Sequence, residues 1–381
     1  MLSLPLVVFS HLRWDFVYQR PQHLLSRLAQ EQAVFVIEEP IRDPDVAPHW
    51  ERQTPRPQVT VYRPHTPCPE SGFGDAQLPD LKVLVERLVR EEDLKRCLAW
   101  MYTPMALPLI ELFEPEVLVY DCMDELSAFD LAPPQLMERE RQLLDRADVV
   151  FTGGPSLYRA KQGRHPNVHL FPSSVDTEHF RQALSGLPEP QDQAGLPRPR
   201  LGYFGVIDER LDRPLLAHLA ALHPEWQIIM IGPVVKIDPA TLPQAPNLHY
   251  LGQRFYETLP AYLAGWDLCL LPFARNAATR FISPTKTLEY MAAERPIVST
   301  PITDVQEPYG DIVYLGDTSE AFVEACERAL ASSAAERVRR GDKMRAVLKN
   351  TSWDVTAAAM QRLIREARER KRSSDTALSA S

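Results

Sequence analysis

Residues 283–300 read Ser-Pro-Thr-Lys-Thr-Leu-Glu-Tyr-Met-Ala-Ala-Glu-Arg-Pro-Ile-Val-Ser-Thr, and they predict a helix start, a short helix, a turn and a buried strand. Ser283 is a suitable N-cap, and Pro284 suits a first helical position because its missing N–H costs nothing there. The amides of a first helical turn have no partner within the helix and lie at the positive end of its dipole. The stretch therefore favours a phosphate at this helix start.

Three side chains of this stretch share one face of the predicted helix. Glu289 follows Lys286 by three residues and Thr285 by four, which is the spacing of neighbours on a helix surface. Lys286 adds a mobile positive charge beside a bound phosphate, and the Glu289 carboxylate is placed to accept hydrogen bonds from ribose hydroxyls. The alternative is a capped amphipathic helix whose lysine and glutamate are merely solvated.

Length and composition indicate two domains and exclude some partners. The chain has 381 residues, of which 45% are hydrophobic and 24% charged, and this length exceeds that of one ordinary core. A formal net charge of -9 argues against a nucleic-acid partner, because such a partner requires a basic face. The five cysteines form no CxxC pair, which suits a reducing compartment and gives no zinc site.

The first ten residues are apolar but have no basic leader, so they predict a buried strand rather than a signal peptide. No apolar run approaches the roughly 18 residues that would span a bilayer. We therefore expect a cytoplasmic protein, and peripheral contact at the inner membrane face stays open.

Short apolar strands alternate with helical patterns along both halves of the chain. The expected strands include residues 4–10, 33–37, 97–102, 117–120, 149–152, 199–204, 227–231, 248–251, 268–271 and 297–299. Strands that are apolar throughout and separated by helices indicate parallel sheets covered on both faces. Two such assemblies in succession predict an α/β fold with two doubly wound domains, whose ligands bind in a cleft between facing sheets.

The clearest break in composition lies at residues 181–199, which are rich in glycine and proline and predict a linker. We expect an N-terminal domain at residues 1–180 and a C-terminal domain at 200–350. A helix at residues 355–371 is expected to pack back on the N-terminal domain, followed by a disordered tail at 373–381. The basic run that ends this helix is either solvated or in contact with a membrane surface.

Histidines, a carboxylate and arginines concentrate after the first expected strand, which indicates a site for a polar ligand. The candidates for catalysis are His23, His11, Asp15 and Arg20. His23, His11 or Asp15 would orient or deprotonate an acceptor hydroxyl. A lone histidine in a helix is more often structural, and that alternative stays open for His23.

Asp121 and Asp124 leave the end of another expected strand. They either orient sugar hydroxyls or cap the following loop. The chain contains no G-x-S-x-G, no Walker loop and no G-x-G-x-x-G, so these sequences give no sign of a serine hydrolase elbow, a P-loop or a dinucleotide fingerprint.

Candidate ligand-binding residues also follow strands in the second half. Gly205 ends a strand and allows close approach of the backbone to a ligand, and Arg210 beyond it is placed to pair with a phosphate. Arg254 and Phe255 follow another strand, where an aromatic ring could meet the face of a nucleobase. Arg280 precedes the stretch at 283–300 and could reach the same anion. For each side chain the alternative is an ordinary loop arginine, or a ring packed under its own helix.

Residues 171–180, 247–273 and 283–300 together resemble the GT4-like group of GT-B glycosyltransferases. The first stretch resembles the segment that usually ends Gly-Val-Asp, the second the middle of the nucleotide-binding domain, and the third the diagnostic block Leu-Glu-x-Met-Ala. Trp14-Asp15 and the block Gln-Arg-Pro-Gln-His at 19–23 further resemble the TuaH-like, teichuronic-acid-type bacterial branch.

The resemblance implies a GT-B fold of two Rossmann-like domains, with the acceptor in the N-terminal domain and a nucleotide-sugar donor in the C-terminal one. By that likeness Glu289 holds the donor ribose, while Lys286, Thr285 and Arg280 hold its diphosphate beside Ser283. Trp14, Asp121 and Asp124 are then expected contacts of the acceptor or of the sugar.

This chain departs from the family pattern at three positions, and it also lacks the glycine-rich loop that the family has after the first strand. The family often has a glutamate eight residues before the one that matches Glu289, and Phe281 stands there. Glu294 replaces the glycine before the strand at 297–299, and Gly205-Val206 replaces a Gly-Arg pair. These departures leave room for a protein that binds without catalysing.

The function expected from these features is a metal-independent glycosyltransferase of the hexosyl type. It would move a sugar from a nucleoside-diphosphate sugar to a hydroxyl of a carbohydrate or lipid-linked acceptor, with uridine favoured by family habit and guanosine next. The resemblance suggests retention of configuration and a role in bacterial polysaccharide or glycoconjugate synthesis. No cofactor is expected, because the nucleotide sugar is a substrate. The alternatives are a nucleotide-sugar epimerase and a catalytically silent nucleotide-sugar-binding protein.

Overall fold

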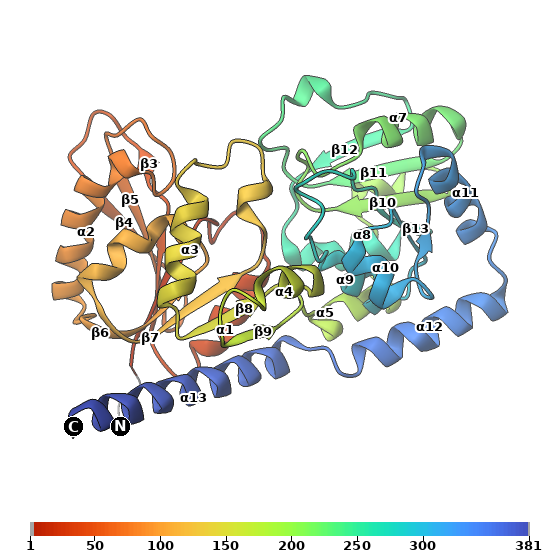
Figure 1. The fold of residues 1–381 in the computed structure, drawn as a ribbon. Helices are drawn as coiled ribbons and strands as arrows, with labels where there is room; N and C mark the ends of the chain where they lie inside the picture. Colours follow the sequence, from red (N-terminus) through yellow and green to blue (C-terminus); the bar gives the residue numbers. More distant parts are fainter. Residues whose placement is uncertain (1–3, 380–381) are drawn as a thin grey trace. The chain divides into compact units, whose positions relative to one another are not determined.

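Two α/β units make up the chain, and each is built on its own predominantly parallel sheet (Figure 1). This computed structural model describes residues 4–379, with side chains described through Ser373. The first unit runs to Pro172 and takes in the chain again from Asp354, whereas the second runs from Ser173 to Trp353. The predicted α/β class is confirmed.

The sheet of the first unit has the strand order β3-β5-β2-β1-β6-β7-β8-β9, and β4 pairs with β5 outside this path. Only the β4–β5 pair is antiparallel among the pairs of this sheet in the described residues. β1 and β8 are buried along their whole length, as expected for strands covered on both faces. The strands are β1 (Leu6–Ser10), β2 (Val34–Glu38), β3 (Ile41–Arg42), β4 (His49–Arg56), β5 (Val59–Thr66), β6 (Arg96–Met101), β7 (Glu114–Cys122), β8 (Val149–Thr152) and β9 (Val168–Leu170).

The helices of the first unit alternate with these strands along the chain. They are α1 (Arg20–Leu28), α2 (Leu78–Glu91), α3 (Leu136–Arg146) and α4 (Pro155–Lys161), together with a 3₁₀ helix at Pro104–Leu112. The last helix, α13 (Trp353–Ser379), returns the chain to this unit.

Ion pairs attach α13 to the first unit. Arg368 Nε lies 2.5 Å from a Glu116 oxygen, and Lys371 Nζ lies 3.0 Å from a carboxylate oxygen of Asp148. Basic side chains near the end of this helix therefore neutralise carboxylates of their own unit.

α13 also continues to Ser379, where the sequence predicts a disordered tail over residues 373–381. The stretch contains no glycine or proline that would end the helix, although serine, threonine and aspartate predominate in it. Residues 380–381 lie outside the described residues.

The sheet of the second unit is parallel and has the order β12-β11-β10-β13-β14-β15. Successive strands from β10 to β12 are added on one side of the sheet, and β13 to β15 are added on the other side, as in folds built from two mononucleotide-binding halves. The direction of addition therefore reverses between β10 and β13. Ligands of such sheets bind beyond the carboxyl ends of the strands at the reversal. The strands are β10 (Arg200–Phe204), β11 (Gln227–Ile231), β12 (Leu248–Gly252), β13 (Leu268–Leu271), β14 (Ile297–Ser299) and β15 (Tyr314–Leu315).

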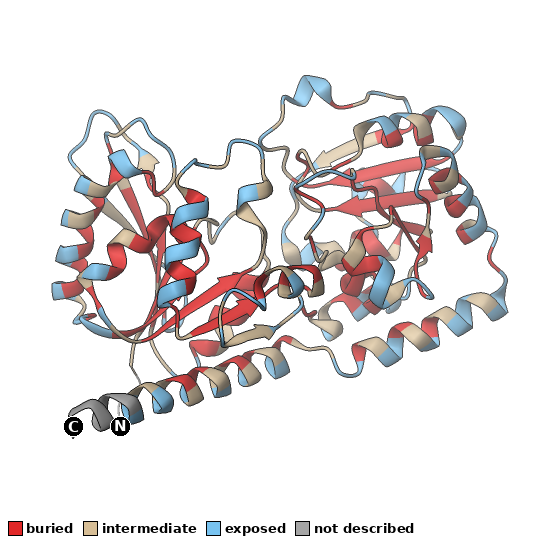
Figure 2. Ribbon diagram, viewed as in Figure 1, coloured by how far each residue is buried: buried red, intermediate tan, exposed pale blue. Residues whose placement is uncertain are grey.

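Helices pack around this second sheet, with α7 against α11, and α9 against both α5 and α12 (Figure 1). Figure 2 shows burial concentrated on the strands and on the inner faces of the helices. The helices are α5 (Thr177–Arg181), α6 (Gln191–Ala194), α7 (Arg213–Leu222), α8 (Leu259–Ala264), α9 (Lys286–Ala292), α10 (Thr303–Tyr309), α11 (Ser319–Leu330) and α12 (Ala334–Leu348).

Residues 181–199 do not form the linker that their composition predicts, because they pack within the second unit. Gln193 is fully buried there, donates a hydrogen bond to the Tyr262 carbonyl (3.1 Å) and accepts one from Trp266 Nε1 (2.8 Å). Phe180 belongs to the same core and stacks on Phe204. The chain therefore enters the second unit at Ser173, earlier than the predicted boundary at 180.

Within residues 4–379, no helix combines the length and the apolar character needed to cross a bilayer.

Candidate active site

Two glycines bring backbone close together at the carboxyl ends of β10 and β11. Gly205 and Gly232 both have positive φ, at +142° and +146°. A Cβ atom at Gly232 would overlap the Gly205 carbonyl oxygen, and a Cβ atom at Gly205 would overlap Lys286 Cε. Only glycine therefore fits at either position.

Lys286 extends from the first residue of α9 to the end of β10. Its Nζ lies 5.8 Å from the centroid of the Tyr203 ring, within reach of a cation–π interaction. Tyr203 is buried and donates its hydroxyl to the Val206 carbonyl at 3.0 Å, so the ring is held in place. The ammonium group is thereby positioned where the strand order reverses.

Glu289 lies one turn further along α9 and is 9% exposed. Burial raises the pKa of this carboxyl to about 7, and the positive charge of Lys286 opposes the rise. A buried acidic group beside a lysine at the end of a parallel sheet is a typical feature of a binding site.

α9 starts two residues later than the sequence predicts. The helix begins at Lys286 with Thr285 as its N-cap residue, so Ser283 and Pro284 precede it. The Thr287 amide already donates to the Pro284 carbonyl at 3.1 Å, which makes the entry a tight turn rather than a serine-capped helix start. The prediction of an N-cap at Ser283 is wrong.

A tyrosine of α9 fixes the helix to the sheet. The Tyr290 hydroxyl accepts a hydrogen bond from the Phe204 amide at 3.2 Å, and the two rings meet edge to face. Because this contact is buried, it holds α9, and with it Lys286 and Glu289, in a fixed position against the sheet.

The two predicted phosphate-binding arginines have protein contacts in the structure. Arg210 donates to the buried Asp208 carboxylate, with Nη2 at 2.6 Å from Oδ2. The Arg280 guanidinium lies 5.2 Å from the Phe281 ring centroid. The ring of Phe281, which stands where the family often has a glutamate, thus contacts the guanidinium of Arg280.

Arg254 and Phe255 differ in what they contact. Arg254 pairs with Asp192 at 2.6 Å and donates to the Tyr262 hydroxyl at 2.8 Å, which supports the structural alternative for this arginine. Phe255 is 81% exposed, so its ring does not pack under its own helix. The neighbouring Tyr256 instead stacks on His179.

In the first unit, Arg20 and Asp121 form a buried bidentate pair. Arg20 Nε and Nη2 lie 3.0 and 2.8 Å from the two Asp121 oxygens, and Nη1 donates to the Phe171 carbonyl at 2.8 Å. The exposed fractions of these side chains are 4% and 0%. Their polar groups therefore contact one another, and neither presents a free group to a ligand as the sequence predicts.

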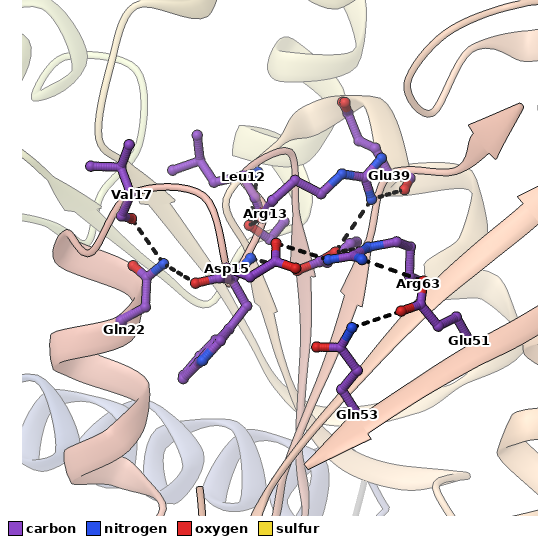
Figure 3. A network of polar contacts seen from close by, with 12 residues as sticks. Leu12, Arg13, Asp15, Val17, Gln22, Glu39, Glu51, Gln53 and Arg63 are labelled. Carbon is purple, nitrogen blue, oxygen red and sulfur yellow. Dashed lines mark hydrogen bonds and ion pairs between the residues drawn. The ribbon is translucent and has the colours of Figure 1, made fainter. Parts of the chain in front are cut away.

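A network of charges surrounds the loop that follows β1 (Figure 3). The buried Glu38 carboxylate accepts hydrogen bonds from the Trp14 amide at 2.6 Å and from Arg63 Nε at 2.8 Å. Arg63 also pairs with the half-exposed Asp15 at 3.0 Å. Asp15 thus lies at the solvent side of the network and remains a candidate for acceptor contact.

The remaining candidates lie in the same unit. His23 is buried and meets the Tyr18 ring edge to face at 4.6 Å, a structural environment for a histidine. His11 is half-buried in the loop after β1. The Asp124 carbonyl accepts a hydrogen bond from Cys122 Sγ at 3.5 Å, and its side chain stays a predicted sugar contact.

Sequence reasoning missed Glu38, Arg63 and Tyr203. Glu38 had a recognisable signal, because a carboxylate directly ends the buried strand β2 beside β1. Arg63 lies within a strand and Tyr203 within a buried run, so neither position differs in pattern from an ordinary strand residue. Among the residues that the structure describes, no group of three or more His, Cys, Asp or Glu could hold a metal ion.

Residues 198–332, which include Gly205, Lys286 and Glu289, match the family described as Glycosyl transferases group 1. The second unit is a group 1 glycosyltransferase domain. A curated relative, the putative teichuronic acid biosynthesis glycosyltransferase TuaH of Bacillus subtilis (strain 168), is 24% identical over 280 residues, covering 68% of this chain and 70% of the relative.

Solved structures give the fold of the whole chain. An E. coli structure described as trehalose-6-phosphate bound with UDP-2-fluoro glucose has a TM-score of 0.69 at 13% identity, covering 96% of this chain and 99% of the other. Sucrose-phosphate synthase from Thermosynechococcus elongatus has a TM-score of 0.71 at 16% identity with the same coverage. The chain thus has the GT-B fold that the resemblance implied, and its match at residues 198–332 is to a glycosyltransferase family.

Proposed function

We propose that this glycosyltransferase transfers a sugar from a uridine-diphosphate sugar to a hydroxyl of a carbohydrate or lipid-linked acceptor. The single observation that carries the proposal is the placement of Lys286 over Gly205, with the Glu289 carboxyl one turn along the same helix. The UDP-2-fluoro glucose bound in the E. coli structure supports a UDP-sugar donor. The teichuronic acid biosynthesis in the name of the Bacillus relative supports a role in polysaccharide synthesis.

In this proposal Lys286 binds the diphosphate and stabilises the negative charge that develops as it leaves the sugar. Glu289 accepts hydrogen bonds from the ribose hydroxyls, and Gly205 leaves the backbone accessible to the phosphates. Phe255 offers its exposed ring to the base, and Arg280 and Arg210 are second candidates for the diphosphate. Transfer proceeds with retention and without a metal ion.

The acceptor belongs to the first unit in this proposal. Asp15, His11 and Trp14 lie in the loop after β1 and would contact the acceptor, with Asp124 as a further sugar contact. We place the reaction in the cytoplasm, on a precursor of a bacterial polysaccharide or glycoconjugate that is either free or held at the inner membrane face.

Calorimetric titration of the full chain with UDP and with uridine tests the donor part of the proposal. We expect UDP to bind more tightly than uridine, by roughly 1.5–3 kcal/mol for the charge-assisted contacts of the diphosphate. The difference should be lost in Lys286→Met and retained in Lys343→Met, whose lysine pairs with Asp311 at the surface. Equal affinity of the wild type for UDP and uridine would contradict the assigned role of Lys286.

Incubation with UDP-glucose and a panel of acceptors then tests transfer. Release of UDP that depends on an acceptor supports a transferase. An isomerised sugar nucleotide formed without acceptor would support an epimerase, and UDP binding without turnover on any acceptor would support a silent binding protein.

A further inference from the structure

Helix α1 contacts the chain next to both points where it passes between the two units. These crossovers lie at Pro172–Ser173 and at Trp353–Asp354. Arg20, the first residue of α1, binds the chain just before the first crossover. Arg27, in the last turn of α1, binds the chain just after the second.

The Arg20 contact is buried and uses the whole guanidinium group. Two of its nitrogens are held by Asp121 at the end of β7, which fixes the direction of the third. That third nitrogen, Nη1, donates to the Phe171 carbonyl at 2.8 Å, one residue before Pro172. Because hydrogen bonds of a buried charged group are costly to break, this contact fixes where the first crossover leaves the unit.

The Arg27 contact is weaker because it is exposed. Arg27 Nε lies 2.7 Å from Asp354 Oδ1, and the exposed fractions of the two side chains are 21% and 77%. Arg27 Nη1 also donates to the His23 carbonyl at 3.0 Å, which orients the guanidinium along α1. Surface pairs of this kind contribute about 0–1 kcal/mol, so we treat Arg27 as a support of the anchor.

Between these two arginines, Gln22 ties α1 to the loop after β1. Its Nε2 donates to the carbonyls of Trp14 at 2.9 Å and Val17 at 3.0 Å, as Figure 3 shows for Val17. Its Oε1 accepts a hydrogen bond from the Gln19 amide at 3.0 Å. The loop that carries His11, Trp14 and Asp15 is therefore attached to the same helix as both crossovers.

We propose that α1 is the hinge anchor of this enzyme, and that Arg20 is a positioning residue that fixes the first crossover relative to the loop after β1, while Arg27 supports the second. Two-domain enzymes change the angle between domains about a few residues where the chain crosses. When those residues are bound to one rigid helix, the domains turn about a defined axis, and the loop moves with that helix. This role of α1 does not depend on which sugar or base the enzyme binds.

Spin labels on the full chain measure this directly. Val83 on α2 and Val338 on α12 are exposed, one in each unit, and can be changed to cysteine in a Cys68→Ser background because the other cysteines are buried. Pulsed electron resonance then gives the distribution of distances between the units, with and without UDP. We expect Arg20→Lys to broaden this distribution in both conditions and to reduce the shift that UDP produces.

The matched control is Arg139→Lys. Arg139 is also a buried arginine of the first unit, donates to the Phe73 and Met105 carbonyls at 3.2 and 2.8 Å, and pairs with Asp75. It contacts neither crossover through these bonds. Equal broadening in the Arg139 and Arg20 variants would overturn the proposal, because it would reflect general loosening of the unit.

Hydrogen exchange provides the second readout. In Arg20→Lys the amides of residues 173–175 should exchange about tenfold faster, the size expected for one lost hydrogen bond to a charged group. The affinity for UDP should stay at the wild-type value, which separates a failure of this inference from a failure of the proposed donor site. Unchanged distances and unchanged exchange at the first crossover would refute the role of Arg20.

If Arg20→Lys does not fold, Arg27→Gln tests the anchor role of α1 instead. This surface change should leave stability nearly unchanged and accelerate exchange only at residues 354–356. An Arg27 variant with wild-type exchange there would mean that α1 does not hold the second crossover, and the anchor would be rejected.

Discussion

The carboxyl ends of the two sheets use charge in different ways. At the end of β10 in the second unit, Lys286 lies over an aromatic ring and a glycine, and the nearby Glu289 is buried with a raised pKa. At the ends of β1 and β7 in the first unit, arginines and carboxylates bind one another at 2.8–3.0 Å.

This difference separates binding groups from positioning groups. A charge whose partners are other side chains is already neutralised, so it fixes a loop or a strand end and offers little to a ligand. Lys286 instead lies against the Tyr203 ring, near the Glu289 carboxyl, at a strand end where parallel sheets of this kind bind ligands. We therefore expect changes in the second unit to alter UDP affinity, and changes in the first unit to alter stability.

The largest expected effect on UDP affinity comes from Gly205→Val. Its side chain would overlap Lys286 Cε and would strain a backbone with φ of +142°. We expect UDP binding to be undetectable by calorimetry. Gly195→Val is the control, because a Cβ atom there meets nothing within 4 Å. Wild-type affinity in the Gly205 variant would show that the ligand binds away from β10.

Lys286→Met keeps an unbranched side chain as far as the ε position and removes the charged nitrogen. The expected loss in UDP affinity is roughly 1.5–3 kcal/mol, the worth of hydrogen bonds to a charged group. Affinity for uridine should change little, since uridine has no diphosphate. A similar loss for both ligands would indicate a structural role for Lys286, and the calorimetric comparison with Lys343→Met tests general effects of removing a surface lysine.

Glu289→Gln should change the pH dependence of stability and of UDP binding, and should have a smaller effect on UDP affinity at low pH. Burial raises the pKa of Glu289 to about 7 from 4.5, so the fold favours the protonated form. Its stabilising contribution is present below pH 4.5 and is lost as the pH rises through 7. Thermal unfolding of wild type and Gln variant should therefore diverge between these values, in favour of the variant at the higher pH.

The affinity of the wild type for UDP should increase with pH, whereas the contribution of Glu289 to stability decreases. The ionised carboxylate is the better acceptor for ribose hydroxyls, so affinity should rise as the pH passes 7. The Gln variant should show no such rise, and Glu294→Gln should behave as the wild type because Glu294 pairs with Arg345 on the surface side of the helix end. Parallel profiles for wild type and Glu289→Gln would exclude this residue from the site.

The smallest expected effect on UDP affinity comes from Glu38→Gln. The buried carboxylate of Glu38 holds the Trp14 amide and Arg63, so its loss should lower the free energy of unfolding by about 1.5–3 kcal/mol. Glu51→Gln is the matched control, since Glu51 contacts the same arginine at 3.3 Å but is more exposed. A large loss of UDP affinity in Glu38→Gln would contradict the assignment of UDP binding to the second unit.

The sequence predicted most of the strands and the face of α9, because both follow from local pattern, but it did not predict β3, β4 and β9. Runs such as residues 268–271 are apolar throughout, and the spacing of Lys286 and Glu289 fixes their shared face. The start of α9 was predicted too early because Ser283 has the residue type of an N-cap, whereas the helix begins at Lys286 after a turn that the Thr287 amide and the Pro284 carbonyl close.

Pairings between distant residues could not be read from the sequence. Arg20 and Asp121 are 101 residues apart, and nothing local distinguishes a buried paired arginine from a free one. The segment at 181–199 has the composition of a linker, yet the burial of Gln193 depends on Tyr262 and Trp266 far along the chain. Tertiary packing decides such cases, and composition does not reveal it.

A crystal structure of the full chain with UDP-2-fluoro glucose would show directly where the donor binds. We expect the diphosphate within hydrogen-bond distance of Lys286 Nζ beside Gly205, and ribose hydroxyls on the Glu289 carboxylate. Clear density for the nucleotide at another place, with Lys286 still over the Tyr203 ring and Glu289 untouched, would contradict it.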